Sequence, residues 1–198
     1  MKSRLSKWIL KRWGFELVGH RPDADHTVMI ASPHTSNWDF PIALLIGWAL
    51  DVNMRWVGKK EMFPPVIGAL WRRLGGIPVD RSSAGSMVQD LTDLFVPGER
   101  MSIVLPVSGT REHTSHWKSG FYRVARGAGV PVVPAFVDYT ARRCGIGDPI
   151  ELTGDITADM DVFREFYAGI EGKYPENDGP VVLREELEAS APPEQSDD

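Results

Sequence analysis

The sequence has little cysteine and no long apolar run, and both absences limit what the chain can be. Cys144 is the single cysteine among 198 residues, so no disulfide can form within the chain, which suits a reducing compartment. No run of about 18 apolar residues is present, so we expect no helix that spans a membrane. The N-terminus lacks a continuous apolar stretch and a small-residue cleavage site, so we expect no signal peptide.

The charge is acidic overall but basic at the N-terminus. The formal net charge of −5 disfavours nucleic acid as the main partner. Residues 1–13 contain five basic side chains and no acidic one, whereas residues 185–198 contain six acidic side chains and no basic one. We therefore predict a basic amphipathic segment at 1–20, one folded domain at 21–185 and an acidic, disordered tail at 186–198.

Apolar side chains recur at helical spacing near the N-terminus, on one side of residues 3–13: Leu5, Trp8, Ile9 and Trp13. Basic side chains occupy the opposite side. This pattern predicts an amphipathic helix that lies on a membrane surface, or else a terminal helix that packs on its own domain.

Strand and helix patterns alternate along the rest of the chain. Strands are predicted at 27–32, 54–58, 77–79, 102–107 and 130–137, and helices at 40–50, 65–74, 86–95, 118–126 and 159–170. Such alternation is typical of an α/β sandwich, so we predict a single domain with a largely parallel sheet flanked by helices.

The strongest local motif is His34 followed by Asp39, directly after the first predicted strand. In a regular helix this offset of five would point the side chains apart, but a turn before a helix that starts at Asp39 brings them together. The imidazole could then accept a proton from a hydroxyl, while the carboxylate orients the ring. Alternatively, Asp39 is a helix N-cap and His34 a structural loop residue.

Three further polar or proline-containing segments accompany other predicted strands. Residues 76–81 end on an arginine, which is a ready phosphate ligand. Residues 108–111 (SGTR) offer backbone N–H groups and a guanidinium, and residues 130–134 (VPVVP) form a strand with two prolines.

In this order the segments resemble the glycerophospholipid acyltransferase family, which includes lysophosphatidate acyltransferases. The first family motif, H-x-x-x-x-D, matches His34 and Asp39, and the second, G-x-x-[FV]-x-R, matches Gly76, Val79 and Arg81. The third motif, E-G-T-R, matches at Gly109, Thr110 and Arg111 only. The fourth motif, V-P-x-x-P, matches Val130, Pro131 and Pro134. The resemblance runs from Thr27 to Val137. It extends to the segments at 58–60 and 117–121, which look like those of short bacterial members.

The resemblance implies an O-acyltransferase that moves a fatty acyl chain from acyl-CoA or acyl-carrier protein to a hydroxyl of a lysophospholipid-type acceptor. His34 and Asp39 are then the catalytic pair, Arg81 and Arg111 bind the acceptor phosphate, and residues 108–110 complete the substrate site. No metal or other cofactor is implied. The implied partners are the acyl donor, the lysolipid acceptor and a membrane surface contacted by residues 1–13. The enzyme is then cytoplasmic and peripheral on the inner face of the membrane.

One residue departs from the family pattern, because Ser108 stands where the family has glutamate. A serine hydroxyl carries no charge, so acceptor identity is open. The chain is alternatively a catalytically impaired lipid- or acyl-CoA-binding protein, or an acyltransferase for a non-glycerol acceptor. A serine hydrolase is disfavoured, since Ser108 lacks the G-x-S-x-G elbow.

The remaining candidate residues have simpler explanations. His113 and His116 are three residues apart, but without a cysteine partner we interpret them as part of a polar loop rather than a metal site. Lys118 either helps to bind phosphate or is a solvated lysine. Cys144 is expected in a glycine-containing turn without the surroundings of a nucleophile. The apolar helices after Asp39 and after residue 60 either line an acyl groove or form plain core.

Overall fold

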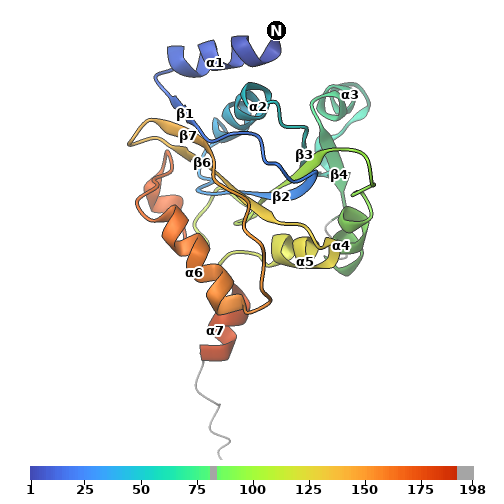
Figure 1. Ribbon diagram of the computed structural model, residues 1–198, viewed down its shortest axis with the longest axis vertical. Coiled ribbons are helices and arrows are strands. Elements are labelled where there is room, and N and C mark those ends of the chain that lie inside the picture. The colour runs from blue at the N-terminus through green and yellow to red at the C-terminus, as the bar shows by residue number, and fades with distance from the viewer. Residues whose placement is uncertain (81–83, 191–198) are drawn as a thin grey trace, which may run out of the picture.

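The computed structural model describes residues 1–80 and 84–190, in which a seven-stranded sheet carries helices on both faces (Figure 1). The strands are β1 (Glu16–Val18), β2 (His26–Ala31), β3 (Met54–Lys59), β4 (Gly76–Val79), β5 (Met101–Pro106), β6 (Val132–Asp138) and β7 (Arg143–Ile146). The helices are α1 (Lys2–Arg12), α2 (Asp39–Ala49), α3 (Pro65–Arg73), α4 (Ala84–Thr92), α5 (Gly120–Ala128), α6 (Ile156–Tyr167) and α7 (Arg184–Ser190), with short 3-10 turns η1 (Lys60–Met62) and η2 (Pro175–Asn177).

The strands follow the order β1-β7-β6-β2-β5-β3-β4 across the sheet. The strands from β6 to β4 are parallel to one another, whereas β7 pairs antiparallel with β6 and β1 pairs parallel with β7. The carboxyl ends of the parallel strands therefore meet along one edge, where α/β proteins place their ligands. The arrangement confirms the predicted single-domain α/β sandwich with a largely parallel sheet.

Alternate side chains of β2 enter two different hydrophobic cores, one on each face of the sheet. Val28 and Ile30 are buried on the face covered by α4, α5 and α6, while Met29 is buried on the face covered by α1 and α2. Because successive side chains of a strand point to opposite faces, a strand covered on both sides must be apolar throughout. Helix α3 shares the face of α2, and its Trp71 ring packs edge-on against Phe40 of α2.

Helix α1 packs on α2, and of the predicted apolar side Ile9 contacts the core while Leu5 and Trp8 do not. Ser6 and Leu10 are buried against the domain, whereas Leu5 is 58% exposed and Trp8 63% exposed. The hydroxyl of Ser3 also donates to the carbonyl of Ala49 at the end of α2, with 2.9 Å between the oxygens. The apolar residues of α1 thus divide between packing and solvent. Within residues 1–80 and 84–190, the helices are all too short or too polar to cross a bilayer.

The patterns in the sequence do not predict the short strands β1 and β7 or the helix α7. Strands β1 and β7 are three and four residues long, too short for a periodic pattern to show. Cys144 was expected in a turn, which is wrong, because it lies buried within β7.

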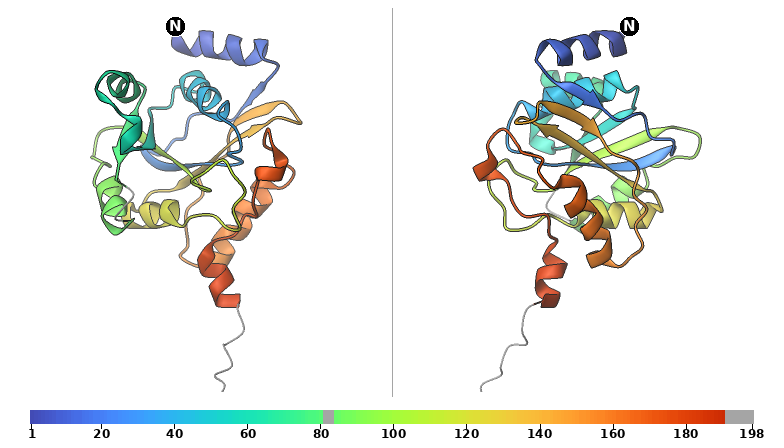
Figure 2. Two further views of the ribbon diagram at one scale, coloured as in Figure 1. Left: turned by 180° about the vertical axis from the view of Figure 1, so that it is seen from behind. Right: turned by 60° about the vertical axis from the view of Figure 1, so that its left-hand side comes forward.

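The acidic tail was predicted to begin at residue 186, which is too early because α7 continues to Ser190. Its acidic side chains are used in packing: Glu186 accepts from Arg164 of α6 with 3.0 Å between N and O, and Glu185 pairs with Arg123 of α5. These pairs hold α7 beside α6 at the end of the molecule away from α1, as the views in Figure 2 show. Residues 191–198 of the predicted tail lie outside the described part of the chain.

Candidate active site

The side chains of His34 and Asp39 meet directly after β2, at the carboxyl edge of the sheet. His34 Nδ1 lies 3.2 Å from Asp39 Oδ2, and both side chains are largely buried, with 16% and 8% of their surfaces exposed. The predicted turn between them is present. It places an imidazole and a carboxylate in hydrogen-bonding contact at the edge where ligands of α/β proteins bind.

The local sequence forms this turn through Ser36. The backbone N–H of Ser36 donates to Asp39 Oδ2 over 2.9 Å, and its hydroxyl accepts from the N–H of Trp38. Trp38, not Asp39, is the N-cap of α2. The carboxylate of Asp39 therefore turns back toward the loop and His34 instead of capping the helix, so the N-cap alternative is wrong.

Tyr139 is a further member of this cluster, and the motifs in the sequence gave no sign of it. Its hydroxyl donates to Asp39 Oδ1 over 2.8 Å from a position 100 residues away in the chain. Burial, followed by the hydrogen bond and charge of Asp39, raises the pKa of Tyr139 above its ordinary value, so the phenol remains a donor. The one feature that could have indicated Tyr139 is its position directly after β6, because β6 pairs with β2, the strand that precedes His34.

The hydrogen bonds determine which ring nitrogen of His34 is free. A carboxylate can only accept, so Nδ1 of His34 carries the proton that it donates to Asp39. In the neutral ring, Nε2 then has the lone pair. The geometry is therefore that of a general base whose tautomer is fixed by a carboxylate.

An apolar cavity of about 420 Å³ opens beside this pair. Its volume lies within the usual range for small-molecule sites, about 300–1,000 Å³. The walls come from α2, β3, η1 and α3 and from β2, β5 and β6. They include Phe40, Ala43, Leu44, Trp56, Met62 and Trp71. The polar residues of the lining, among them His34 and Asp39, follow the carboxyl ends of the strands. A long hydrocarbon chain with a polar end matches this distribution.

The loop after β5 contributes Gly109, Thr110 and Arg111 to the same cavity. Among residues 1–80 and 84–190, the backbone N–H groups of these three residues have no hydrogen-bond acceptor, so they can bind an anion. Gly109 has φ +69°, a backbone conformation that favours glycine, and its Cα faces the flexible side chain of Lys118.

Two other residues predicted for the substrate site lie behind this loop. The hydroxyl of Ser108 donates to the carbonyl of Thr110 over 2.7 Å, and Ser108 is not among the residues that line the cavity. The side chain of Lys118 lies against Gly109 in a separate cavity of about 200 Å³, and its backbone N–H donates to the carbonyl of Val107. Both residues stabilise the loop in this structure.

Arg81 lies outside the described residues, although β4, the strand before it, ends at the same edge of the sheet. A cation that was not singled out, Lys59, lies at the carboxyl end of β3 and lines the cavity. The cavity therefore has two described cations, Lys59 and Arg111, near its polar part. Their charge suits an anionic substrate group.

The remaining candidates take no part in this cluster. His113 Nδ1 contacts the carbonyl of Asp178 at 2.7 Å, and His116 contacts Ser115. Within the described residues, no group of three or more His, Cys, Asp or Glu side chains could hold a metal ion. Burial raises the pKa of the Cys144 thiol to about 12, which keeps it a weak nucleophile.

Comparison with known proteins bears on the reaction that this site performs. A family model described as Acyltransferase matches residues 14–138, more than half of the 198 residues. No curated protein and no solved structure matches the chain. The matched range contains His34, Asp39, the loop at 108–111 and all five parallel strands of the sheet.

Proposed function

The chain belongs to the acyltransferase family, and from this premise we propose that it transfers a fatty acyl chain from a thioester donor to a hydroxyl of a lysophospholipid-type acceptor. The observation that carries the proposal is the contact of 3.2 Å between His34 Nδ1 and Asp39 Oδ2 at the polar end of an apolar cavity. The donor is acyl-CoA or acyl-carrier protein. The proposed step needs no cofactor besides this donor.

The proposed reaction is a direct transfer. His34 Nε2 takes the proton of the acceptor hydroxyl as the oxygen attacks the thioester carbonyl carbon. The carbonyl oxygen becomes an oxyanion, which the free N–H groups at 109–111 in the cavity lining would stabilise. The C–S bond then breaks, the thiolate receives the proton from His34, and the acyl ester is released. Asp39 stabilises the imidazolium while it carries the proton.

The two parts of the substrate fit different parts of the cavity. The apolar walls between α2, β3 and α3 suit the acyl chain, and burial of each methylene stabilises the complex by about 0.8 kcal/mol. Arg111 and Lys59 suit the phosphate of the acceptor, with Arg81 as a further ligand predicted from the family motif. This division supports a lysophosphatidate-like acceptor.

We also propose that the enzyme acts at a membrane surface, on the cytoplasmic face, through residues 1–13. Exposed Leu5 and Trp8 on α1, together with the five basic side chains of this segment, support the proposal. A tryptophan and basic residues on one helix suit the headgroup region of an anionic bilayer. Each basic residue near such a surface contributes about 1 kcal/mol to binding.

Product analysis tests the proposed reaction. Purified protein is incubated with palmitoyl-CoA, or with palmitoyl-carrier protein, and with lysophosphatidate, other lysophospholipids or non-glycerol lipid alcohols, and the lipids are identified by mass spectrometry. We expect a new ester of lysophosphatidate. An ester of another acceptor alone would refute the acceptor assignment. If no acceptor is acylated although the acyl donor binds, the chain is the lipid- or acyl-CoA-binding protein that Ser108 allows.

Ser108→Glu tests whether the family glutamate matters at this position. The serine hydroxyl donates to the carbonyl of Thr110, and a carboxylate cannot, so the variant also removes one contact within the loop. We expect the substitution to change acceptor preference more than the total rate of acyl transfer. If the variant has the same acceptor preference as the wild type, residue 108 does not determine the choice of acceptor.

A further inference from the structure

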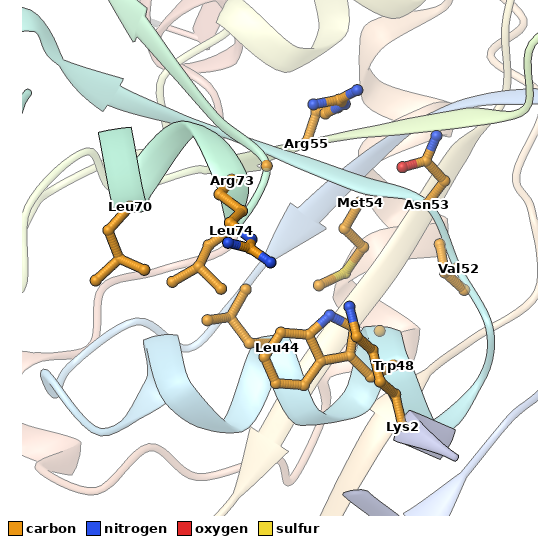
Figure 3. A pocket seen from close by; sticks show the side chains of 12 residues that line it. Lys2, Leu44, Trp48, Val52, Asn53, Met54, Arg55, Leu70, Arg73 and Leu74 are labelled. Carbon is orange, nitrogen blue, oxygen red and sulfur yellow. The ribbon is translucent and has the colours of Figure 1, made fainter. Parts of the chain in front are cut away.

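A second cleft lies on the same face of the sheet, at the opposite end of β3 from the candidate active site. It has a volume of about 440 Å³ and lies between the start of α1, the second half of α2 and the end of α3 (Figure 3). Leu44 and Met54 line this cleft and the active-site cavity alike. These two side chains therefore separate two spaces that differ in their chemistry.

Two cations reach into the cleft. Figure 3 shows the side chains of Lys2 and Arg73 extending toward its middle from opposite sides, whereas Arg55 points away from it. The lining contains no acidic residue, and within residues 1–80 and 84–190 neither Lys2 nor Arg73 forms an ion pair. Lys2 Nζ instead lies 5.9 Å above the ring of Trp48. The cleft thus offers two uncompensated positive charges to an anion.

The walls beneath these cations are apolar, being formed by Leu44, Trp48, Leu70 and Leu74. A small inorganic anion would use the two cations but leave these walls in water. An amphiphile with an anionic headgroup and a hydrocarbon chain satisfies both parts, because burial of apolar surface adds to the charge interaction. The chemistry of the cleft therefore favours an anionic lipid.

The position of the cleft gives such a lipid a route from the bilayer. On α3, the side chains of Val66, Ile67 and Leu70 share one helix face, and they are 85%, 52% and 52% exposed. Leu70 belongs to this exposed apolar face and to the wall of the cleft at once. Figure 1 shows α1 and α3 at the same end of the molecule. The cleft lies between two helices that both present apolar side chains to solvent.

We propose that this cleft binds an anionic phospholipid of the membrane, with the headgroup phosphate between Lys2 and Arg73 and an acyl chain against Leu44, Trp48 and Leu70. The bound lipid is not the substrate of the transfer reaction, because the cleft contains neither His34 nor Asp39. The lipid would hold α1 and α3 on the bilayer with the active-site cavity alongside. This inference does not depend on the acyl-transfer proposal.

The indole N–H signals of Trp48 and Trp71 report separately on the two spaces in ¹H–¹⁵N NMR. Trp48 lines the cleft, whereas Trp71 lines the active-site cavity. Trp56 is not a reporter, because its indole N–H donates to the carbonyl of Leu74 in the wall of the cleft. The full chain is titrated with dihexanoyl phosphatidate kept below its aggregation concentration, and separately with dihexanoyl phosphatidylcholine and with inorganic phosphate. We expect a saturable shift of Trp48 with the phosphatidate alone. A shift of Trp71 without a shift of Trp48 would overturn the proposal, as would an equal response of Trp48 to inorganic phosphate.

Charge reversal on neighbouring positions of α3 separates the cleft from general attraction to an anionic surface. Arg73→Glu places an acid in the cleft, whereas Arg72→Glu makes the same change of net charge one residue away, outside the lining. We expect Arg73→Glu to weaken phosphatidate binding at Trp48 at least tenfold more than Arg72→Glu, and Lys2→Glu to act like Arg73→Glu from another helix. If Arg73→Glu and Arg72→Glu weaken phosphatidate binding equally, the cleft is not a specific lipid site. Thermal unfolding of each variant checks that it is folded.

Discussion

Three hydrogen-bond donors converge on the carboxylate of Asp39, two from the loop after β2 and one from the residue after β6. His34 and the backbone of Ser36 contact Oδ2, and Tyr139 contacts Oδ1. A carboxylate has about four acceptor positions, so most of them are filled by the protein. Hydrogen bonds to a charged acceptor are stronger than neutral ones, and together these three fix the carboxylate against which the His34 ring is oriented.

Tyr139→Phe is predicted to lower kcat about tenfold while the KM values for donor and acceptor remain nearly unchanged. The variant keeps the ring but removes one hydrogen bond to a charged group, which contributes about 1.5–3 kcal/mol. Because Tyr139 contacts Asp39 and does not line the cavity, it positions the pair without binding substrate. Steady-state kinetics with a purified variant of unchanged unfolding temperature measures both parameters.

Tyr174→Phe is the matched control. The backbone N–H of Tyr174 donates to Thr35 in the same loop as His34, but within the described residues its hydroxyl has no hydrogen-bond partner. This variant should leave kcat as in the wild type. If Tyr139→Phe also has the kcat of the wild type, or raises KM alone, the positioning role is wrong.

Asp159 is a second buried carboxylate, far from the site, and it stabilises the fold. It accepts from the hydroxyl of Tyr122 over 2.7 Å and from the backbone and side chain of Thr153 and the backbone of Gly154. Burial alone would raise its pKa, but these hydrogen bonds outweigh burial and lower the pKa. A lowered pKa in the folded state means that ionised Asp159 favours folding.

Asp159→Asn is predicted to lower the free energy of unfolding at neutral pH by about 2 kcal/mol, because one charged acceptor is lost. The stability due to the charge is present above the ordinary carboxyl pKa of about 4 and is lost as pH falls through the lowered folded pKa. Chemical denaturation at pH 7 and pH 3 should therefore show a smaller difference between wild type and variant at pH 3. If the difference in unfolding free energy between wild type and variant is the same at both pH values, the charge of Asp159 does not stabilise the fold.

At the scale of elements, helix α2 connects the chemistry to the proposed acyl-binding surface. It begins at Asp39 and continues with Phe40, Ala43 and Leu44 along the cavity wall. Residues separated by three or four positions share a helix face, so one short helix supplies the carboxylate and the apolar wall together. In the proposed transfer, the reacting end of the acyl chain would therefore lie beside His34.

Ala43→Phe is predicted to reduce transfer from long-chain acyl-CoA at least tenfold while transfer of a short acyl chain is changed less. The larger side chain fills part of a cavity of about 420 Å³ and so shortens the space for hydrocarbon. Rates with acetyl-, octanoyl- and palmitoyl-CoA provide the comparison. Ala69→Phe on α3, which is exposed and outside the lining, is the control. A uniform loss for all three chain lengths would contradict the assignment of this wall to the acyl chain.

Several elements could be predicted from the sequence because their causes are local. The apolar run of β2 and the spacing of His34 and Asp39 are features of short segments, and the structure places these two side chains in contact. Tyr139 could not be found this way, since its link to Asp39 depends on β6 lying beside β2. The tail was misjudged for a similar reason, because the acids of α7 are ordered by arginines on α5 and α6.

On the scale of the whole molecule, exposed apolar side chains gather on helices at one end. Leu5 and Trp8 lie on α1, and Val66, Ile67 and Leu70 lie on α3. Large apolar side chains that are exposed close together indicate a binding surface more strongly than scattered ones do. Removal of residues 1–13 would also uncover the buried contact of Leu10 with α2, so point substitutions test docking more cleanly than truncation.

The double variant Leu5→Ser and Trp8→Ser is predicted to bind vesicles of phosphatidylglycerol and phosphatidylcholine at least tenfold more weakly than the wild type. Each fully buried large apolar side chain contributes about 1.5–3 kcal/mol, and about 1.4 kcal/mol corresponds to a factor of ten. Vesicle sedimentation measures the affinity, and activity on detergent-dispersed substrate should be retained. Val162→Ser, an exposed apolar residue on α6, is the control. Unchanged vesicle binding by the double variant would refute docking through α1.

Thiol release from palmitoyl-CoA in the presence of lysophosphatidate, compared between the wild type and His34→Ala, tests the central claim most directly. His34 is the base in the proposed transfer, and general-base catalysis contributes about 10²–10⁴-fold. We predict that the wild type releases thiol in step with ester formation, and that His34→Ala loses at least a hundredfold in rate while it still binds palmitoyl-CoA. A His34→Ala variant that releases thiol as fast as the wild type would contradict the account.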